Sequence, residues 1–236
     1  MKHMKKAAVA VFLLGQALSG AASAASVTLT GDTVDYTFDD ALLGLFGTPT
    51  LVGDTLSFTP VEFQAESLNG AGIDLTNNTV NVQVTAHSGY NFSSIDMTER
   101  GDYMLLGGGS SANVAGQVRV FDVANPLSDV TTAITPDAPM DVMSSGGTTN
   151  WSASNSTDIS GWTDAQTVNV TWQNLLIGET NSGSSMAFVD KKYGGLTATV
   201  AAVTAVPEAE VSAMMLAGLG LVGWQISRRR GLANRA

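Results

Sequence analysis

The fold of this chain is decided by Thr79-Val-Asn-Val-Gln-Val-Thr85, in which polar and apolar side chains alternate with a period of two. The same alternation recurs in Thr167-Val-Asn-Val-Thr-Trp172. In an extended strand this period places the apolar side chains on one face and the polar side chains on the other. Strands buried on one face are typical of antiparallel sheets, because parallel strands are usually apolar on both faces.

Two copies of a hairpin pattern precede these strands. Residues 28–38 predict a hairpin around Gly31-Asp32, where glycine supplies the positive φ that a tight primed turn needs. Residues 50–58 repeat the Gly-Asp-Thr sequence 22 residues later. We therefore expect two successive hairpins of a meander, with one helical turn over residues 39–46 between them.

Further short strands are expected over residues 92–98, 102–106, 117–123, 130–134, 186–189 and 196–204. No sustained apolar period of 3.6 residues interrupts them, and turn residues separate them. The body, residues 25–205, is therefore predicted to be all-β: an antiparallel β-sandwich or jelly-roll-like domain. Residues 144–165 are rich in Ser, Thr, Gly and Asn, which predicts a long polar surface loop.

Charge and cysteine content exclude several functions. Residues 25–205 carry nineteen acidic residues against four basic ones, namely Arg100, Arg119, Lys191 and Lys192. Such an acidic surface repels nucleic acid, so no nucleic-acid partner is expected. The chain has no cysteine, which excludes disulfides, thiol catalysis and Cys-ligated metals.

The N-terminus has the three parts of a secretion signal. Lys2, Lys5 and Lys6 precede an apolar run over residues 7–18, and Ala22 and Ala24 form a small-residue cleavage site. We expect residues 1–24 to be a signal peptide that signal peptidase removes. The mature chain would then begin near Ser26.

The C-terminus, residues 206–236, also contains an apolar segment next to basic residues. Residues 211–227 carry no charge and are mostly apolar, which predicts a single transmembrane helix of about 25 Å. Arg228, Arg229 and Arg230 follow directly and predict a cytoplasmic end under the positive-inside rule. Residues 218–223 match G-x-G-x-x-G, but no acidic residue follows them, so a dinucleotide site is not expected.

The order Val206-Pro207-Glu208, apolar helix, then Arg228-Arg229-Arg230 resembles the PEP-CTERM sorting signal of Gram-negative bacteria. Ala209 stands where that motif has a second proline. The resemblance implies recognition and cleavage near Pro207-Glu208 by an exosortase-type membrane protease. It further implies a transient inner-membrane anchor and delivery to the cell surface or extracellular matrix. The same tail is also catalogued as the C-terminal domain of ice-binding proteins, but the body lacks a regular Thr-x-Thr ladder.

The body is poor in catalytic side chains. His87 is the only histidine outside the signal peptide, and its surroundings do not resemble a nucleophile elbow, so no catalytic residue is assigned. No cofactor motif and no metal site are assigned either. Structural calcium stays an alternative without a ligand set, with these aspartates available in turns or loops: Asp39, Asp40, Asp122, Asp158 and Asp164.

Two tryptophans in the polar stretch, Trp151 and Trp162, are candidate glycan contacts, because an indole ring can stack on a sugar ring. The competing interpretation is that they pin the loop to the sheet. The sequence therefore favours a non-enzymatic exported protein that associates with exopolysaccharide in a biofilm matrix. The alternative is a small polysaccharide-active enzyme with two carboxylates, of the glycosidase type.

Overall fold

The computed structural model describes residues 26–203 and 214–225. Several predicted features lie outside these residues. They are the signal peptide 1–24 with Ala22 and Ala24, the sorting residues Val206, Pro207 and Glu208, and the basic residues Arg228, Arg229 and Arg230.

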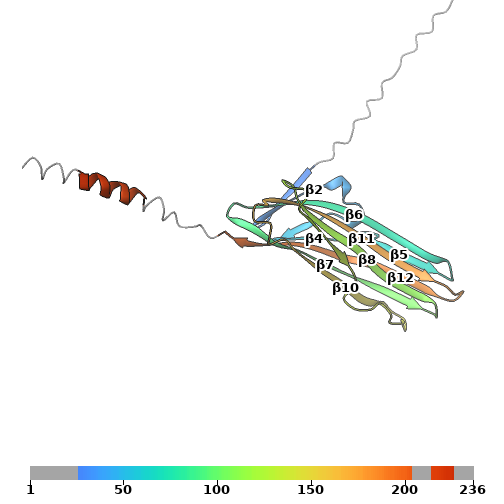
Figure 1. Ribbon diagram of the computed structural model, residues 1–236. Helices are drawn as coiled ribbons and strands as arrows, with labels where there is room; N and C mark the ends of the chain where they lie inside the picture. The colour runs from blue at the N-terminus through green and yellow to red at the C-terminus, as the bar shows by residue number, and fades with distance from the viewer. Residues whose placement is uncertain (1–25, 204–213, 226–236) are drawn as a thin grey trace, which may run out of the picture.

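The described body is an antiparallel β-sandwich of two sheets, which confirms the predicted all-β class (Figure 1). The first sheet has the order β1-β2-β6-β11-β8-β9 and the second has β10-β7-β12-β4-β3, with β5 also paired to β12. The strands of the first sheet are β1 (Ser26–Thr30), β2 (Val34–Asp39), β6 (Gly72–Ala86), β8 (Ser110–Asp122), β9 (Asp129–Ile134) and β11 (Thr167–Thr180). Those of the second are β3 (Thr50–Val52), β4 (Thr55–Phe58), β5 (Gln64–Leu68), β7 (Tyr90–Leu106), β10 (Thr149–Asp158) and β12 (Met186–Ala202).

The two alternating stretches lie at the centre of the first sheet. β6 and β11 pair antiparallel with Val82 opposite Val170 and Val80 opposite Trp172. These four side chains are buried between the sheets, while the intervening polar residues face outward. The period-two prediction is therefore confirmed where it was strongest, and it places Trp172 in the middle of the core.

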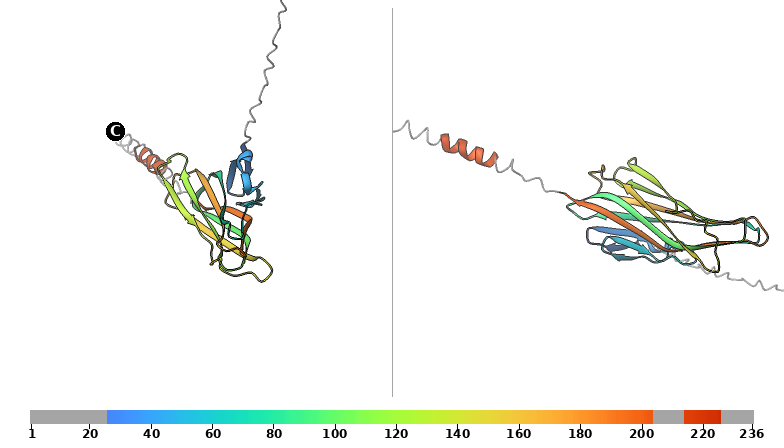
Figure 2. Two further views of the ribbon diagram at one scale, coloured as in Figure 1. Left: turned by 90° about the vertical axis from the view of Figure 1, so that its right-hand side faces the viewer. Right: turned by 90° about the horizontal axis from the view of Figure 1, so that it is seen from below.

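The N-terminal hairpins form as predicted, but the meander is wrong. β1 and β2 belong to the first sheet, whereas β3 and β4 belong to the second. Two short 3₁₀ helices, η1 (Asp40–Leu42) and η2 (Gly44–Phe46), carry the chain across from one sheet to the other. Figure 2 shows this N-terminal part gathered at one end of the long strands. Phe46, at the end of η2, is fully buried, so the crossing segment also contributes to the core.

The turns of the two hairpins bind each other. Thr33 donates both its backbone N–H and its hydroxyl to the Asp54 carboxylate, at 2.9 and 2.6 Å. The Tyr36 hydroxyl donates to the Asp54 carbonyl and accepts from the Ala198 backbone N–H at 2.9 Å. Burial raises the pKa of Tyr36 well above its ordinary range, so the hydroxyl stays protonated and keeps its donor.

The predicted long loop over residues 144–165 is wrong in its central part. Residues 149–158 form β10, the edge strand of the second sheet, which pairs with β7 along its length. Trp151 lies opposite Gly101, and its indole N–H donates to the Asp190 carbonyl at 3.1 Å. The polar composition of this strand did not predict it. All of its outward residues are polar, and Trp151 and Ala153 are its only buried apolar residues.

Residues 214–225 are helical, within the predicted transmembrane segment 211–227. Their apolar side chains, including Met214 and Leu216, are exposed. Within the described residues, no helix has both the length and the apolarity required to cross a membrane.

Gly101 leaves the space that Trp151 fills, so we predict that Gly101→Ala destabilises the fold. An added Cβ would collide with the Asp190 carbonyl oxygen and lie 2.7 Å from Trp151 Nε1. Overpacking of this kind costs about 1–3 kcal/mol. Urea denaturation followed by tryptophan fluorescence measures the loss. Gly108→Ala is the matched control, because nothing lies within 4 Å of its added Cβ. Equal stability of the two variants would contradict the packing argument.

Candidate functional site

The core contains a buried ion pair between the two central strands of the second sheet. Lys191 Nζ on β12 lies 2.8 Å from Glu99 Oε1 on β7, and both side chains have no exposed surface. Lysine and glutamate are rarely buried, because each loses its hydration on folding. This pair is therefore the least expected chemical feature of the sandwich.

Two side chains from the opposite sheet complete the hydrogen bonding of Glu99. Trp172 Nε1 donates to Glu99 Oε1 at 2.8 Å, and Asn174 Nδ2 lies 2.7 Å from both Oε1 and Oε2. Asn174 is fully buried as well, and its Oδ1 has no hydrogen-bond partner. The Glu99 carboxylate is thus shared by a lysine of its own sheet and by an indole and an amide from β11.

Aromatic rings surround the Lys191 ammonium. Its Nζ lies 4.3 Å from the Trp172 ring centroid, 4.4 Å from that of Phe46 and 5.4 Å from that of Phe63. Ring faces attract a cation and exclude water, but they do not replace its hydration shell. Burial accordingly lowers the pKa of Lys191, and the neighbouring Glu99 opposes this change.

A β-bulge and a glycine follow the lysine along β12. The register of β12 against β7 shifts between Lys191 and Tyr193, so Lys192 is the extra residue of the bulge. Lys191 points into the core and Lys192 outward by ordinary strand alternation, and the bulge shifts the series so that Gly194, not Tyr193, takes the next inward position. Gly194 leaves room for the pair, since a Cβ there would lie 2.8 Å from the Trp172 ring and 3.5 Å from Lys191 Cε.

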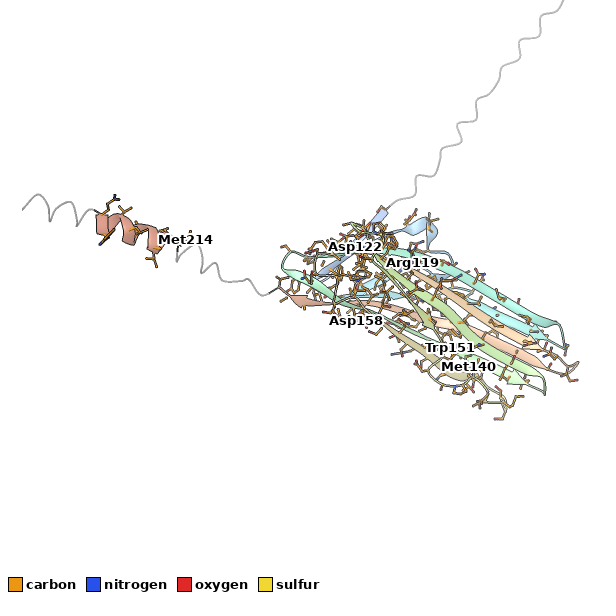
Figure 3. The ribbon with its side chains drawn as sticks, viewed as in Figure 1. Arg119, Asp122, Met140, Trp151, Asp158 and Met214 are labelled. Atoms are coloured by element: carbon orange, nitrogen blue, oxygen red, sulfur yellow. The ribbon has the colours of Figure 1, made fainter. Side chains whose placement is uncertain are left out.

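A surface cleft of about 460 Å³ lies over the same strand segments. Arg100 and Lys192, the chain neighbours of the buried pair, line it together with Asp102. The other lining residues are Gly101, Tyr103, Ala138, Pro139, Met140, Asn150, Trp151 and Ser152. Figure 3 shows Met140 and Trp151 side by side at this position. Two of the four basic residues of the body thus meet at one hollow.

The outer face of the second sheet is polar and carries a second hollow, of about 310 Å³, at Asp96 between β7 and β10. Asp96 on β7 accepts hydrogen bonds from Ser94, from Ser156 on β10 and from Thr199 on β12. Tyr193 lies across Gly195, and the Arg100 guanidinium carbon is 5.6 Å from its ring centroid. This face therefore presents hydroxyls, one partly exposed aromatic ring and one exposed guanidinium.

The two predicted tryptophans lie at different places. Trp151 is only 5 % exposed and packs over Gly101, so its ring face is not open for stacking, although its edge borders the cleft. Trp162 is partly buried against the core and borders a separate hollow of about 180 Å³. Both tryptophans therefore pack against the sandwich, as the competing interpretation expects, and a glycan contact at either one stays a prediction.

The candidate calcium ligands do not converge on one point. Asp39, Asp122 and Asp158 each accept a backbone N–H two residues ahead, which is the bonding of a turn cap. Figure 3 shows Asp122 and Asp158 apart from Trp151. Asp122 and Asp164 border the same small hollow as Trp162. Within residues 26–203 and 214–225, no group of three or more metal-ligating side chains is close enough to hold an ion.

His87 is bound to a carboxylate in a turn. Its Nε2 lies 3.0 Å from Asp35 Oδ1, and its backbone N–H donates to the Thr33 carbonyl at 2.8 Å. The hydrogen bond to Asp35 raises the pKa of His87 and lowers that of Asp35. The histidine thus fastens the turn after β6 to the first hairpin.

Sequence reasoning missed the buried cluster and the basic pair of the cleft. Glu99 and Lys191 are charged residues, a type that is rarely buried, so composition alone predicts that they are exposed. One usable signal existed: Lys191 continues the inward series of Ala187 and Val189 at spacing two. Asn174 likewise continues the series of Val168, Val170 and Trp172.

Comparisons with known proteins assign no family. No family model matches the chain, and no curated protein matches it. A solved structure of infectious bursal disease virus, Gt strain, is similar at a TM-score of 0.24 and 11% identity, over 74% of this chain and 50% of that chain. The enzymatically active domain of bacteriophage CBA120 tailspike protein 4 gives a TM-score of 0.21 and 9% identity, over 72% and 19%. The chain spans half or less of these proteins, and likenesses this weak carry no functional argument.

The Asp35–His87 pair predicts a raised histidine pKa that Asp35→Asn returns to its ordinary value. Its stabilisation is fully present below the unfolded histidine pKa of about 6.5 and is lost as pH rises through the folded pKa. A titration of the His87 ring protons by NMR, assigned against His87→Gln, measures both values. An unchanged pKa in Asp35→Asn would show that the contact does not hold in solution.

Proposed function

We propose that this chain is an exported cell-surface or matrix protein, non-enzymatic, which associates with acidic sugars of an exopolysaccharide through the Arg100–Lys192 cleft. The net negative charge of the body opposes the approach of a polyanion, so we confine the contact to this cleft, and salt of about 0.15 M screens the repulsion beyond about 8 Å. The supporting observation is the place of the basic residues. In a body with nineteen acidic residues and four basic ones, Arg100 and Lys192 both line one hollow. Arg119 lies on β8 of the other sheet and is paired with Asp129 at 3.0 Å, whereas Arg100 and Lys192 share the cleft, where Lys192 is also paired with Asp190.

The cleft combines the groups that bind an acidic sugar. Guanidinium and ammonium groups bind carboxylates by charge-assisted hydrogen bonds. The exposed residues Ala138 and Pro139 provide apolar surface for ring carbons, and Asn150 and Ser152 can bond hydroxyls. The adjoining outer face of Asp96, Tyr193 and their hydroxyl neighbours extends this surface for a longer polymer.

Export and sorting belong to the same proposal. The signal peptide delivers the body across the inner membrane, and the tail 206–236 holds it until an exosortase-type protease acts near Pro207-Glu208. The support is the order of the three tail elements in sequence. The destination is then the surface or biofilm matrix, where a polysaccharide ligand is abundant.

The glycosidase alternative requires two carboxylates on either side of a bound sugar, about 5–10 Å apart. Among the described residues, those lining the cleft include one acid, Asp102. Asp190 lies nearby but is ion-paired to Lys192. This arrangement favours binding over hydrolysis.

We predict that the full chain binds a soluble polyuronate such as alginate and binds neutral dextran much more weakly. Arg100→Gln and Lys192→Gln should each weaken alginate binding about fivefold, the equivalent of ~1 kcal/mol for an exposed charge pair. Affinity electrophoresis at two salt concentrations measures the retention.

Arg119→Gln is the matched control, because it removes the same charge from the opposite sheet. Equal losses in all three variants would indicate non-specific attraction and overturn the cleft assignment. Release of oligosaccharides from the polymer would support the enzyme alternative instead.

Deletion of residues 207–236 should move the protein from the cell surface or matrix to the soluble periplasm. The reason is that the deletion removes both the predicted membrane anchor and the cleavage site. Fractionation and immunoblotting of the producing cells measure this directly. An unchanged location would contradict the sorting proposal and leave the polysaccharide test unaffected.

A further inference from the structure

The buried cluster has the composition of a reaction centre. A lysine amine, a primary amide and a carboxylate meet with no exposed surface, and no ligand could reach them from solvent. The chain also has no cysteine, so no disulfide can stabilise its exported body. An amine and an amide held together in this way can react with each other to form a covalent bond.

We propose that Lys191 Nζ and Asn174 Cγ form an intramolecular amide bond, with Glu99 transferring the protons. The bond joins β12 in the second sheet to β11 in the first. It is a covalent link across the core of the sandwich, made by the folded chain itself.

The first argument is proximity. Lys191 Nζ and Asn174 Nδ2 are both bonded to the same atom, Glu99 Oε1, at 2.8 and 2.7 Å. The amine and the amide therefore occupy neighbouring positions around one oxygen. Holding two reactants side by side raises their effective concentration, which reaches about 10⁵ M or more where the reacting atoms are aligned.

The second argument is the state of the nucleophile. Only a neutral amine attacks a carbonyl, and removal from water disfavours the ammonium form. The proton has a defined acceptor, because Glu99 Oε1 lies at hydrogen-bond distance. Its transfer converts a charged pair in an aromatic cage into a neutral amine and a carboxylic acid.

The third argument is the unsatisfied amide oxygen. In the present orientation Asn174 Nδ2 contacts both carboxylate oxygens, and the buried Oδ1 has no partner. A half-turn about Cβ–Cγ exchanges the two atoms and brings Oδ1 to the carboxyl group. Protonated Glu99 then donates to Oδ1 and polarises the carbonyl, so the step that frees the amine also activates the amide.

The step balances without any further reagent. The Nζ lone pair forms a bond to Cγ, and the carbonyl electron pair moves to Oδ1. When the carbonyl re-forms, the Cγ–Nδ2 bond breaks, and Glu99 passes two protons in succession from Nζ to the leaving nitrogen, which departs as ammonium. An ammonium and a primary amide become a secondary amide and an ammonium ion, while Glu99 returns to a carboxylate. Nothing is oxidised or reduced.

Peptide mass spectrometry of the folded full chain tests the bond. Trypsin does not cleave after an acylated lysine, so the linked chain yields a peptide from Val120 through Lys192. Its mass is lower than that of its sequence by one ammonia, and fragmentation places a closed loop between Asn174 and Lys191. This peptide has no Asn-Gly sequence, which removes the commonest other source of ammonia loss.

Two variants separate the reaction from the fold, with circular dichroism confirming that each is folded. Asn174→Asp should give a linked peptide of the same final mass as the wild type, because water leaves in place of ammonia. Glu99→Gln should give an unlinked peptide that ends at Lys191 with the full mass of its sequence. The melting temperature of this variant should fall by about 5–15 °C for the lost cross-link and further for the broken ion pair, so the peptide mass and not the melting temperature decides the test.

The proposal is overturned if folded wild-type protein yields a peptide of full sequence mass ending at Lys191. A linked peptide from folded Glu99→Gln would overturn the role of Glu99 while leaving the bond. Neither result depends on polysaccharide binding, so the two proposals can fail separately.

Discussion

The packing of the two sheets depends on the hydrogen bonds and ring contacts that surround one buried ion pair, Lys191 and Glu99. Lys191 and Glu99 lose all contact with water, and breaking such a pair by removing one partner typically costs about 3–5 kcal/mol. The surrounding core is arranged to prevent that loss. Trp172 and Asn174 arrive from the opposite sheet, Phe46 from the 3₁₀ crossing and Phe63 from the segment before β5. The two sheets therefore meet in one register, since a slip of one residue would turn Asn174 outward.

The strand segments that carry the buried pair also carry two residues of the surface cleft, Arg100 and Lys192. Glu99 and Arg100 are chain neighbours, as are Lys191 and Lys192, and in each pair one side chain is buried and the other exposed. Both reversals follow from strand alternation, and the bulge at Lys192 turns Tyr193 toward the same outer face. The cationic groups of the cleft therefore stand on the same two strands as the buried pair, on the opposite face of the sheet.

Much of the fold could be predicted from sequence, and its failures have physical causes. Period-two alternation identified β6 and β11 because valines, and in β11 a tryptophan, occupy every second position and polar residues stand between them. β10 was missed because a strand paired on one edge can present serines outward with few apolar residues inward. The hairpins were predicted from local turn chemistry, but local chemistry does not say which sheet a hairpin joins. Of the candidate site, Trp151 was the one chosen residue that borders the cleft, while Glu99, Asn174 and Lys191 required the pairing of strands distant in sequence.

The position of β12 has a mechanical consequence. β12 is the final strand of the described body, ending at Ala202, and it is hydrogen-bonded to β7 along almost its whole length. Tension applied through the C-terminal end would act along the strand, perpendicular to those hydrogen bonds, and so would load many of them at once. Lys191 stands midway along this strand, with its side chain held from both sheets. A body held by its C-terminal end against flow would thus resist being unravelled one bond at a time.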